Sequence, residues 1–259
     1  MLRAYDAQLR AHVSDRLPEG MSVEHDGPIT RTIDAGQRGW VEYRDLGDLD
    51  EAALDDLIAR QVARFAERGE SFEWKAHGHD RPAFLTDRLR AAGFVAEEQE
   101  TILVARIADL ELDAPPPDGV RVYEVDTRAE FERIETMENE VWSENDTTRA
   151  EALEREKAAD PQALRVVVAE SDGRVVCAGW LRFPANTEFG TLWGGGTLEQ
   201  YRHRGIYRAV VAYRGRLAAE RGRLYLQVDA SDNSRPILER MGFQAVTTTT
   251  PWIWRPPRA

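Results

Sequence analysis

The stretch GTLWGGGTLEQYRHRGIYRAVVAYRGRLAAERGRLYLQVDASDNSRPILERMGF, residues 190–243, decides how the rest of the chain is read. At its centre the segment RHRGIY, residues 202–207, forms a basic, glycine-bearing turn between a predicted strand and an amphipathic helix. Such a turn offers free backbone N–H groups and the positive end of a helix dipole. The sequence therefore predicts a phosphate-binding turn at this place in the chain.

The size and composition of the chain indicate a soluble globular protein. Its 259 residues suffice for two domains, and with 42% hydrophobic residues it can bury a core. No segment approaches the roughly 18 apolar residues of a membrane span. The charged N-terminal residues 1–15 lack the apolar centre of a signal peptide. We therefore expect a cytoplasmic protein with no membrane partner.

The charge and the scarcity of cysteine exclude several kinds of site. A formal net charge of −12 argues against nucleic-acid binding, which requires a basic face. Residues 202–223 nevertheless hold seven arginines and one acid, Glu220, a local patch that fits a small polyanionic ligand. Cys177, the only cysteine, excludes an intramolecular disulfide and is expected to be a buried structural thiol. We expect no metal site, and none at His77 and His79.

Hydrophobic periodicity and turn signals predict alternating helices and strands in both halves. The first half has predicted strands at 21–33, 40–43, 71–75 and 99–107, and helices at 3–13, 50–68 and 82–92. The second half has predicted strands at 120–125, 164–169, 174–183, 189–198, 224–230 and 244–254, and helices at 128–142, 148–159, 206–221 and 235–241. The fourth and fifth strands of the second half are joined by a helical crossover, so we expect them to be parallel neighbours.

The clearest boundary is the segment APPPDG, residues 114–119, because a proline run makes a semi-rigid spacer. It predicts a first domain at 1–113 and a second at 120–259. Residues 71–107 match 224–254 in outline, and both copies contain a Gly-Phe pair after the short helix. We infer two copies of one fold. In the first copy the segment YRDLGDLDE, residues 43–51, has four acids where the second copy has arginines, so we expect no nucleotide there.

From Gly119 onward the chain resembles the GCN5-related N-acetyltransferase (GNAT) superfamily. The fingerprint of that family is Gln/Arg-x-x-Gly-x-Gly/Ala; Arg202 and Gly205 match it, and Tyr207 departs from it. The segment ILERMGF, residues 237–243, resembles the family's late helix. The resemblance implies an α+β fold of tandem GNAT-like domains, the first of them degenerate. Each is a mixed, mostly antiparallel sheet flanked by helices, with splayed parallel fourth and fifth strands in the second copy.

The resemblance also implies that acetyl-CoA binds as the acyl donor. The backbone of residues 203–207 would hold the pyrophosphate, and residues 196–198 would pair with the pantetheine arm. The run of glycines at 194–196 suits either a bulge facing the ligand or a merely irregular strand. The residues expected to contact acetyl-CoA are Gly196, Thr197, Leu198, Arg202, His203, Arg204, Gly205, Ile206, Tyr207, Arg208 and Ser231.

Catalytic roles are less well defined by the resemblance. Family members often use a tyrosine of the late helix as the acid, but that position is Leu238. Tyr225 and Tyr207 are either substitutes or packing residues. Asp229, at the end of the fifth strand, is either a general base or a capping carboxylate. The residues expected at the acceptor site, or else on a solvated acidic face, are Glu140, Trp142 and Glu144.

Three functions follow from this sequence. The first is an N-acyltransferase that moves an acetyl group from acetyl-CoA to a primary amine, of a small molecule or a peptide, by direct transfer in a ternary complex. The second is a non-catalytic acyl-CoA sensor or structural member of the same fold. The third is a protein modifier whose acidic first domain docks a basic partner.

Overall fold

The computed structural model describes residues 1–34, 37–143 and 145–257, which divide into two compact units. The first unit consists of Met1–Val13, Gly20–Ile102 and Ala245–Ala259. The second consists of Ser14–Glu19 and Leu103–Gln244. Each unit has its own helices and hydrophobic core, so the strands and helices of each are described by themselves.

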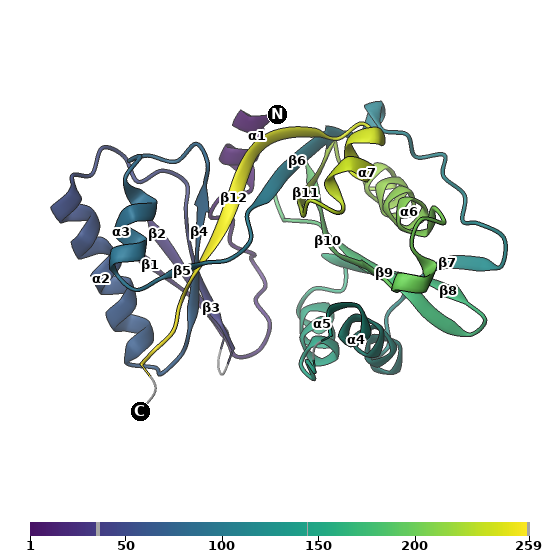
Figure 1. Ribbon diagram of the computed structural model, residues 1–259, viewed down its shortest axis with the longest axis horizontal. Helices are drawn as coiled ribbons and strands as arrows, with labels where there is room; N and C mark the ends of the chain where they lie inside the picture. Colours follow the sequence, from purple (N-terminus) through teal and green to yellow (C-terminus); the bar gives the residue numbers. More distant parts are fainter. Residues whose placement is uncertain (35–36, 144, 258–259) are drawn as a thin grey trace. The chain divides into compact units, whose positions relative to one another are not determined.

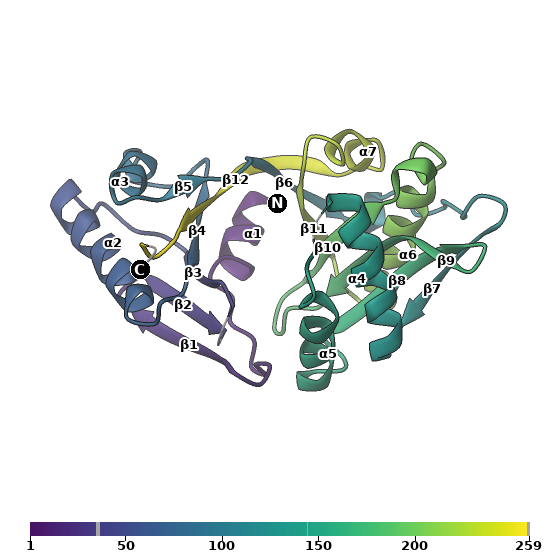
Figure 2. The same cartoon turned by 60° about the horizontal axis from the view of Figure 1, so that its bottom comes forward.

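The sheet of the first unit has the strand order β1-β2-β3-β4-β12. Its elements are α1 (Leu2–Gln8), β1 (Met21–Asp26), β2 (Ile29–Asp34), β3 (Gly39–Tyr43), α2 (Glu51–Ala66), β4 (Phe72–His77), α3 (Leu85–Ala91), β5 (Val95–Ala96), the first part of β6 (Glu100–Arg106) and most of β12 (Gln244–Trp254). β3 and β4 are parallel and are joined by α2, whereas β12 runs antiparallel to β4. Figures 1 and 2 show α2 and α3 along one face of this sheet and α1 against the other.

Side-chain alternation along β4 explains how both faces of the first sheet are covered. Phe72 and Trp74 are fully buried, and Phe72 stacks on Phe65 of α2 with 4.2 Å between ring centroids. His77 points to the opposite face, where the Tyr5 hydroxyl of α1 lies 2.9 Å from its Nε2. Because successive side chains of a strand face opposite sides, α2 and α1 pack on opposite faces.

One expected strand of the first unit is in fact a hairpin. The predicted strand at 21–33 is divided into β1 and β2, which pair antiparallel from Met21↔Asp34 to Asp26↔Ile29. Gly27 has a φ of +60° in the turn between them, a conformation that glycine adopts without a steric cost. The single-strand prediction was therefore wrong, although the residues do form extended backbone.

The sheet of the second unit has the strand order β6-β11-β10-β9-β8-β7. Besides the latter part of β6, its elements are β7 (Val120–Val125), α4 (Arg128–Trp142), α5 (Arg149–Ala159), β8 (Leu164–Ser171), β9 (Arg174–Arg182), β10 (Phe189–Thr197), α6 (Ile206–Glu220), β11 (Tyr225–Ala230) and α7 (Arg235–Arg240). β10 and β11 are parallel, and the other pairs from β7 to β10 are antiparallel. The predicted parallel pairing of the fourth and fifth strands is confirmed.

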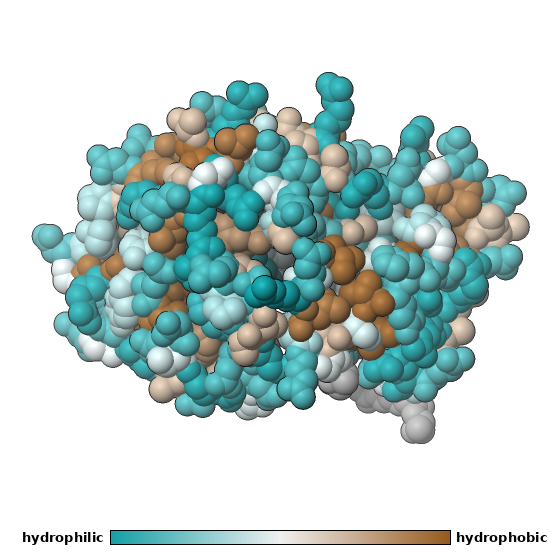
Figure 3. All heavy atoms as spheres, turned by 180° about the vertical axis from the view of Figure 1, so that it is seen from behind, coloured by the Kyte–Doolittle hydropathy of each residue, from teal (hydrophilic) through white to brown (hydrophobic). Residues whose placement is uncertain are grey.

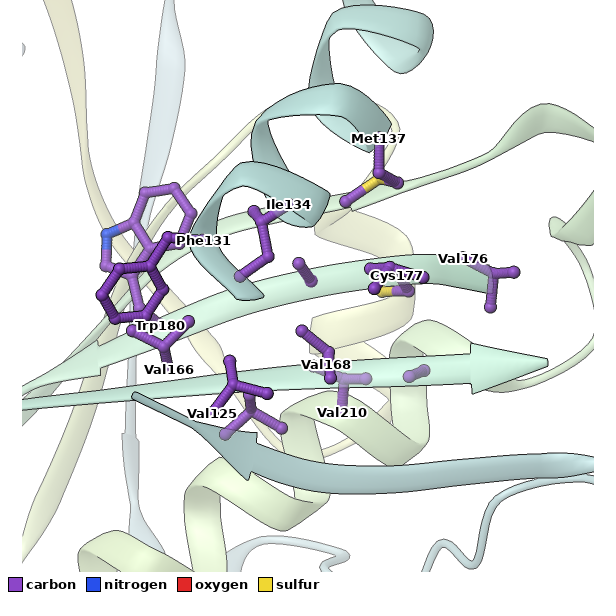
Figure 4. Close-up of a cluster of buried hydrophobic side chains, with 14 of the residues drawn as sticks. Val125, Phe131, Ile134, Met137, Val166, Val168, Val176, Cys177, Trp180 and Val210 are labelled. Carbon is purple, nitrogen blue, oxygen red and sulfur yellow. The ribbon is translucent and has the colours of Figure 1, made fainter. Parts of the chain in front are cut away.

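Helices cover both faces of the second sheet, as β9 shows. A methyl group added at Gly179 would lie 2.6 Å from Arg214 Nη1 of α6. The next residue, Trp180, faces the other way, and the Arg149 guanidinium of α5 lies 5.5 Å from its ring centroid. On that second face, Figure 4 shows side chains pointing from α4 toward β9. They are Phe131, Ile134 and Met137, all at most 3% exposed.

The boundary between the two compact units does not fall at residues 114–119, where the sequence predicted it. Ala114 is 6% exposed in the core of the second unit, and Arg216 Nη1 of α6 donates to the Leu112 carbonyl at 2.7 Å. The last strand, by contrast, belongs to the first unit, because residues 249–254 pair with β4. Polar side chains cover most of the face seen in Figure 3, in keeping with the 31% of charged residues.

Candidate functional site

The parallel strands β10 and β11 separate at their carboxyl ends. Their pairing runs from Phe189↔Tyr225 to Leu192↔Val228 and stops there, while β10 continues to Thr197 and β11 to Ala230. The backbone groups of the last residues of these strands are thus not paired with each other. We call the space between the diverging ends the split.

A bulge in β10 accompanies the split. Gly194 pairs with Gly179 of β9, but three residues later Thr197 pairs with Cys177, so β10 contains one extra residue. Gly194 and Gly195 have φ values of +65° and +108°, which only glycine adopts readily. This register shift makes the strand irregular at 194–197, and the bulge redirects the backbone beside the split.

The predicted phosphate-binding turn connects β10 to α6. Arg202 to Arg204 are exposed, with the Arg202 Nε donating to the Thr197 carbonyl at 3.1 Å and the Arg204 guanidinium 5.1 Å from the Tyr201 ring centroid. Gly205 is the N-cap of α6 with a φ of +82°, and a methyl group added there would meet nothing within 4 Å. The turn is thus open on the side where an anion would approach.

The start of α6 differs chemically from the start of α2, which follows the equivalent strand in the first unit. The Asp50 side chain caps α2 by accepting from the Ala53 N–H at 2.9 Å, and Glu51 adds a second carboxylate. Gly205 offers no side-chain cap to α6, and no acidic residue lies in its first turn, among the residues described. The first N–H groups of α6 remain available to a ligand, whereas those of α2 face carboxylates.

Tyr207 lies against the bulge, on the face of the sheet that α6 covers. A methyl group added at Gly195 would lie 2.9 Å from its Cε2 atom. Burial raises the pKa of Tyr207, whereas the charge of Arg214 and a hydrogen bond with Ser234 act to lower it. Ser234 precedes α7, and its Oγ lies 3.3 Å from the Ser231 Oγ. Tyr207 thus connects the bulge, the start of α6 and the start of α7.

Of the two residues predicted to be catalytic, the structure brings only Asp229 to the split. Asp229 is half-buried just beyond the last paired residue of β11, where Gln227 Nε2 donates to its Oδ1 at 2.6 Å. Tyr225 stands at the other end of β11, four residues or about 13 Å away. Its ring stacks on Phe189 with 5.0 Å between centroids. Tyr225 is therefore a packing residue distant from the split.

A pocket of about 240 Å³ lies between the end of α4 and the segment that follows β10. It is lined by Glu140, Val141, Ser143, Leu198, Glu199, Gln200 and Arg202. Its neighbour Trp142 is 58% exposed, and a methyl group at Gly196 would lie 3.7 Å from the Trp142 Nε1. The structure thus brings Glu140 and Trp142 close to the end of β10. Glu144, predicted with them, lies outside the described residues.

Comparison with known proteins identifies the second unit. The sequence model of the acetyltransferase (GNAT) family matches residues 131–243, which include the bulge, the turn and α7. We call the unit whose residues 131–243 match this family model the GNAT domain. No curated protein sequence is similar enough to this chain to count as a relative.

Solved structures extend the fold of the GNAT domain to the whole chain. A GCN5-related N-acetyltransferase from Kribbella flavida is 18% identical, with a TM-score of 0.71 over 93% of this chain and 91% of that one. A tandem GNAT protein from the clavulanic acid biosynthesis pathway is 12% identical, with a TM-score of 0.64 over 100% and 94%. The α+β fold of tandem GNAT-like domains is therefore confirmed.

The sequence reasoning missed Arg214 of the GNAT domain, which is only 1% exposed. Its Nη1 donates to the carbonyls of Trp180 and Trp193, at 3.1 and 3.0 Å, and thereby holds β9 and β10 where the bulge begins. In the described part of the chain its hydrogen bonds go to backbone carbonyls, and no carboxylate is among its charge partners. The available signal was its spacing of seven residues from Tyr207, which places both on one face of α6.

Two residues of the GNAT domain are part of its core. Leu238, at the position of the family's tyrosine, is 0% exposed among the apolar residues beneath α7. Cys177 is also 0% exposed, and burial raises the pKa of its thiol to about 11. The prediction of a buried Cys177 is confirmed, and neither side chain can act on a ligand in this position.

The described residues contain no cluster of three or more His, Cys, Asp or Glu side chains placed to hold a metal ion. His77 and His79 instead take part in hydrogen bonds within the first unit, His77 with Tyr5 and His79 with Thr247. Of the helices described, none combines the length and the apolar character needed to cross a membrane.

Proposed function

We propose that the GNAT domain is an N-acyltransferase that moves an acetyl group from acetyl-CoA to a primary amine. The observation that carries this proposal is an open, uncapped helix start at Gly205 directly after a strand that separates from its parallel neighbour. A helix start binds phosphate, and a split between strands offers backbone groups to an extended chain. Acetyl-CoA has both a pyrophosphate and an extended pantetheine arm.

The donor would bind along the edge from the turn to the split. The N–H groups of residues 203–207 would hold the pyrophosphate, with charge from the exposed arginines Arg202, Arg204 and Arg208. Ile206 is buried, so it contributes its backbone alone. The pantetheine arm would pair with residues 196–198, which β11 leaves free, and Ser231 would lie beside it.

Acyl transfer needs a neutral amine, a polarised thioester carbonyl and a proton for the departing sulfur. Asp229 lies at the split, where it would take a proton from the attacking amine directly or through water. Gln227, only 6% exposed, orients this carboxylate through its hydrogen bond. The backbone N–H groups of Gly195 and Gly196, at the bulge, would polarise the carbonyl. Transfer would take place directly, in a ternary complex of donor, amine and protein.

The acceptor would enter by the pocket between α4 and the end of β10. Glu140 would attract a cationic amine, although Arg174 already pairs with it, and Trp142 would cover the apolar part of the acceptor. The described part of this pocket suits a small-molecule amine or the amine of a peptide. Glu144 belongs to the same proposal. A buried free thiol such as Cys177 fits the reducing cytoplasm, where we place the reaction.

Leu238 supports a second candidate, a non-catalytic acyl-CoA sensor. Its apolar side chain is fully buried where the family often carries a proton-donating tyrosine. A sensor would bind acetyl-CoA as the enzyme does but would transfer no acyl group. The acidic first unit, if it docks a basic protein, would make that protein the acceptor, and a salt-sensitive pull-down tests that third function.

The decisive experiment combines calorimetry with single-turnover assays. Acetyl-CoA is titrated into the full chain, and the complex is then mixed with a panel of aliphatic amines, aminoglycosides and basic peptides while release of the CoA thiol is followed. We expect binding in the micromolar range and thiol release with at least one class of amine. Binding without any transfer would replace the enzyme by the sensor, and absence of binding would refute both.

A further inference from the structure

Arg214 presents an unusual electrostatic feature, a buried positive charge that no carboxylate of the described residues pairs with. Transfer of a guanidinium from water to the interior is costly unless the charge is paired. Arg214 is 1% exposed, and its hydrogen bonds go to neutral carbonyls of Val210, Trp180 and Trp193. The groups near it that can become negative are the Tyr207 phenol and the Cys177 thiol.

Of these two groups, only Tyr207 can reach a ligand. Cys177 is fully buried under α6, while Tyr207 is half-buried, with its ring on the bulge of β10. A methyl group at Gly195 would lie 2.9 Å from the Tyr207 Cε2 and 3.7 Å from its hydroxyl oxygen. The hydroxyl therefore lies beside the strand segment that leads into the split.

The groups around Tyr207 suit a proton donor. From β9 comes the neutral Cys177 thiol, from α6 the Arg214 guanidinium and from the start of α7 the Ser234 hydroxyl. Burial is the largest influence and raises the pKa of Tyr207, so the phenol carries its proton at neutral pH. When the proton leaves, the nearby guanidinium stabilises the phenolate.

We propose that Tyr207 protonates the departing CoA sulfur and that Arg214 is the positioning residue that holds the bulge and stabilises the phenolate. This inference rests on the proposed acyl transfer. As the tetrahedral intermediate collapses, the carbon–sulfur bond breaks and its electron pair goes to sulfur, which takes the proton from the Tyr207 hydroxyl. The phenolate regains a proton from water through Ser234. The nitrogen loses its proton to Asp229 and from there to water, so protons balance.

The test compares Tyr207→Phe with Tyr213→Phe, a second half-buried tyrosine of the same helix. Each variant keeps the aromatic ring and loses only the hydroxyl group. For Tyr207→Phe we expect kcat to fall by about 100-fold, a typical share for one general acid, with the KM for acetyl-CoA unchanged. Its rate should also lose the decline at high pH that ionisation of Tyr207 causes in the parent protein. Tyr213→Phe should match the parent. Equal kcat values in all three proteins would overturn the proposal.

A binding experiment decides the same point without turnover. The parent should bind CoA about fivefold more tightly than CoA lacking its sulfur, and this preference should disappear in Tyr207→Phe, as loss of one hydrogen bond predicts. An unchanged preference overturns the inference while the proposed function stands. If neither compound binds the parent, the proposed function itself fails.

Arg214 is tested by the pH at which the rate declines. Arg214→Met removes a charge that lowers the pKa of Tyr207, so the decline should move to higher pH, and Arg214→Lys should leave it near its original place. The absorbance of phenolate, taken as the difference from Tyr207→Phe, reports the same shift without turnover. If Arg214→Met does not fold, Arg214→Lys still decides, because lysine keeps the positive charge but packs differently. A decline at the original pH supports the role of the charge, and a decline at a shifted pH indicates a purely packing role.

Discussion

The open turn at Gly205 allows a sharp test, because the other end of the same helix provides its control. Gly205 precedes α6 with a φ of +82°, and Gly222 follows the helix with a φ of +68°. A methyl group at either position would meet nothing within 4 Å. Replacement by alanine therefore creates no clash in either case, and the cost comes from the left-handed backbone alone.

That cost is about 1–2 kcal/mol for a residue with a Cβ atom. Gly205→Ala and Gly222→Ala should therefore lower the free energy of unfolding of the GNAT domain by similar amounts, measured as equal shifts of the urea midpoint. They should differ in binding. At Gly205 the methyl group would occupy the space into which the pyrophosphate must fit, whereas Gly222 lies one helix length, about 22 Å, from the turn.

We expect Gly205→Ala to weaken acetyl-CoA binding at least tenfold, or about 1.4 kcal/mol. Gly205→Asp adds a negative charge beside the pyrophosphate and should weaken binding by about 100-fold or more, a repulsion of about 3 kcal/mol. Isothermal titration calorimetry gives these values, with Gly222→Ala binding as the parent does. Unchanged affinity in Gly205→Asp, or equal losses in Gly205→Ala and Gly222→Ala, would refute the assignment of the turn.

Three further predictions concern buried groups. Asp80→Ala should lower the free energy of unfolding of the first unit by about 3–5 kcal/mol, because it removes the carboxylate that pairs with buried Arg10 at 2.6 Å; a urea midpoint within error of the parent would contradict this. Burial alone would raise the Asp80 pKa, but hydrogen bonds from His77 and Tyr43 and the charge of Arg10 lower it to about 2, from 3.8. The unfolded chain then binds more protons, so stability is complete above pH 4 and is lost as the pH falls toward 2; Asp80→Asn should lose this dependence in acid titrations followed by circular dichroism. Cys177, 0% exposed with a thiol pKa of about 11, should resist iodoacetamide in the native protein and react in urea, and rapid native modification would contradict its burial.

Most elements of the GNAT domain could be predicted because their signals are local. The strand 120–125 and the helix 128–142 have the predicted bounds. At the start of this helix the Thr127 side chain accepts from the Glu130 N–H, and the Glu130 side chain accepts from the Thr127 N–H. This capping box involves residues only three positions apart, so it can be read from the local sequence. The hairpin turn at Asp172 and Gly173 likewise has the positive φ values that an Asp-Gly pair predicts.

The hairpin at 21–34 was missed for a physical reason. Its turn consists of two residues, Gly27 and Pro28, so paired residues such as Val23 and Thr32 share a face although one position is odd and the other even. The apolar residues Met21, Val23, Ile29 and Ile33 all have odd positions, as they would along a single strand, yet the turn places the first two on the opposite face from the last two. The Gly-Pro pair was the remaining local signal.

Long-range partners could not be predicted from such signals. The strand 244–254 has the predicted bounds, yet nothing in its own residues says that it pairs with β4. The place of Tyr225 relative to the split could not be predicted either, because it depends on where β10 and β11 stop pairing. Arg214 was missed because an arginine at a core-facing position looks the same in sequence as its six exposed or half-buried neighbours between 202 and 223.

The two units differ in the features that the proposed donor site requires. Both have a parallel strand pair joined by a helix, α2 in one and α6 in the other. At the start of α2 the Asp50 carboxylate already satisfies an N–H group and would repel phosphate. At the start of α6 a glycine leaves those groups free, and arginines replace the acids.

Removing Asp50 alone would not create a site in the first unit. Glu51 would still repel phosphate, and the described pairing of β3 contains no bulge of the β10 kind. The proposed donor site requires the uncapped helix and the split strand together, and only the GNAT domain combines them among the residues described.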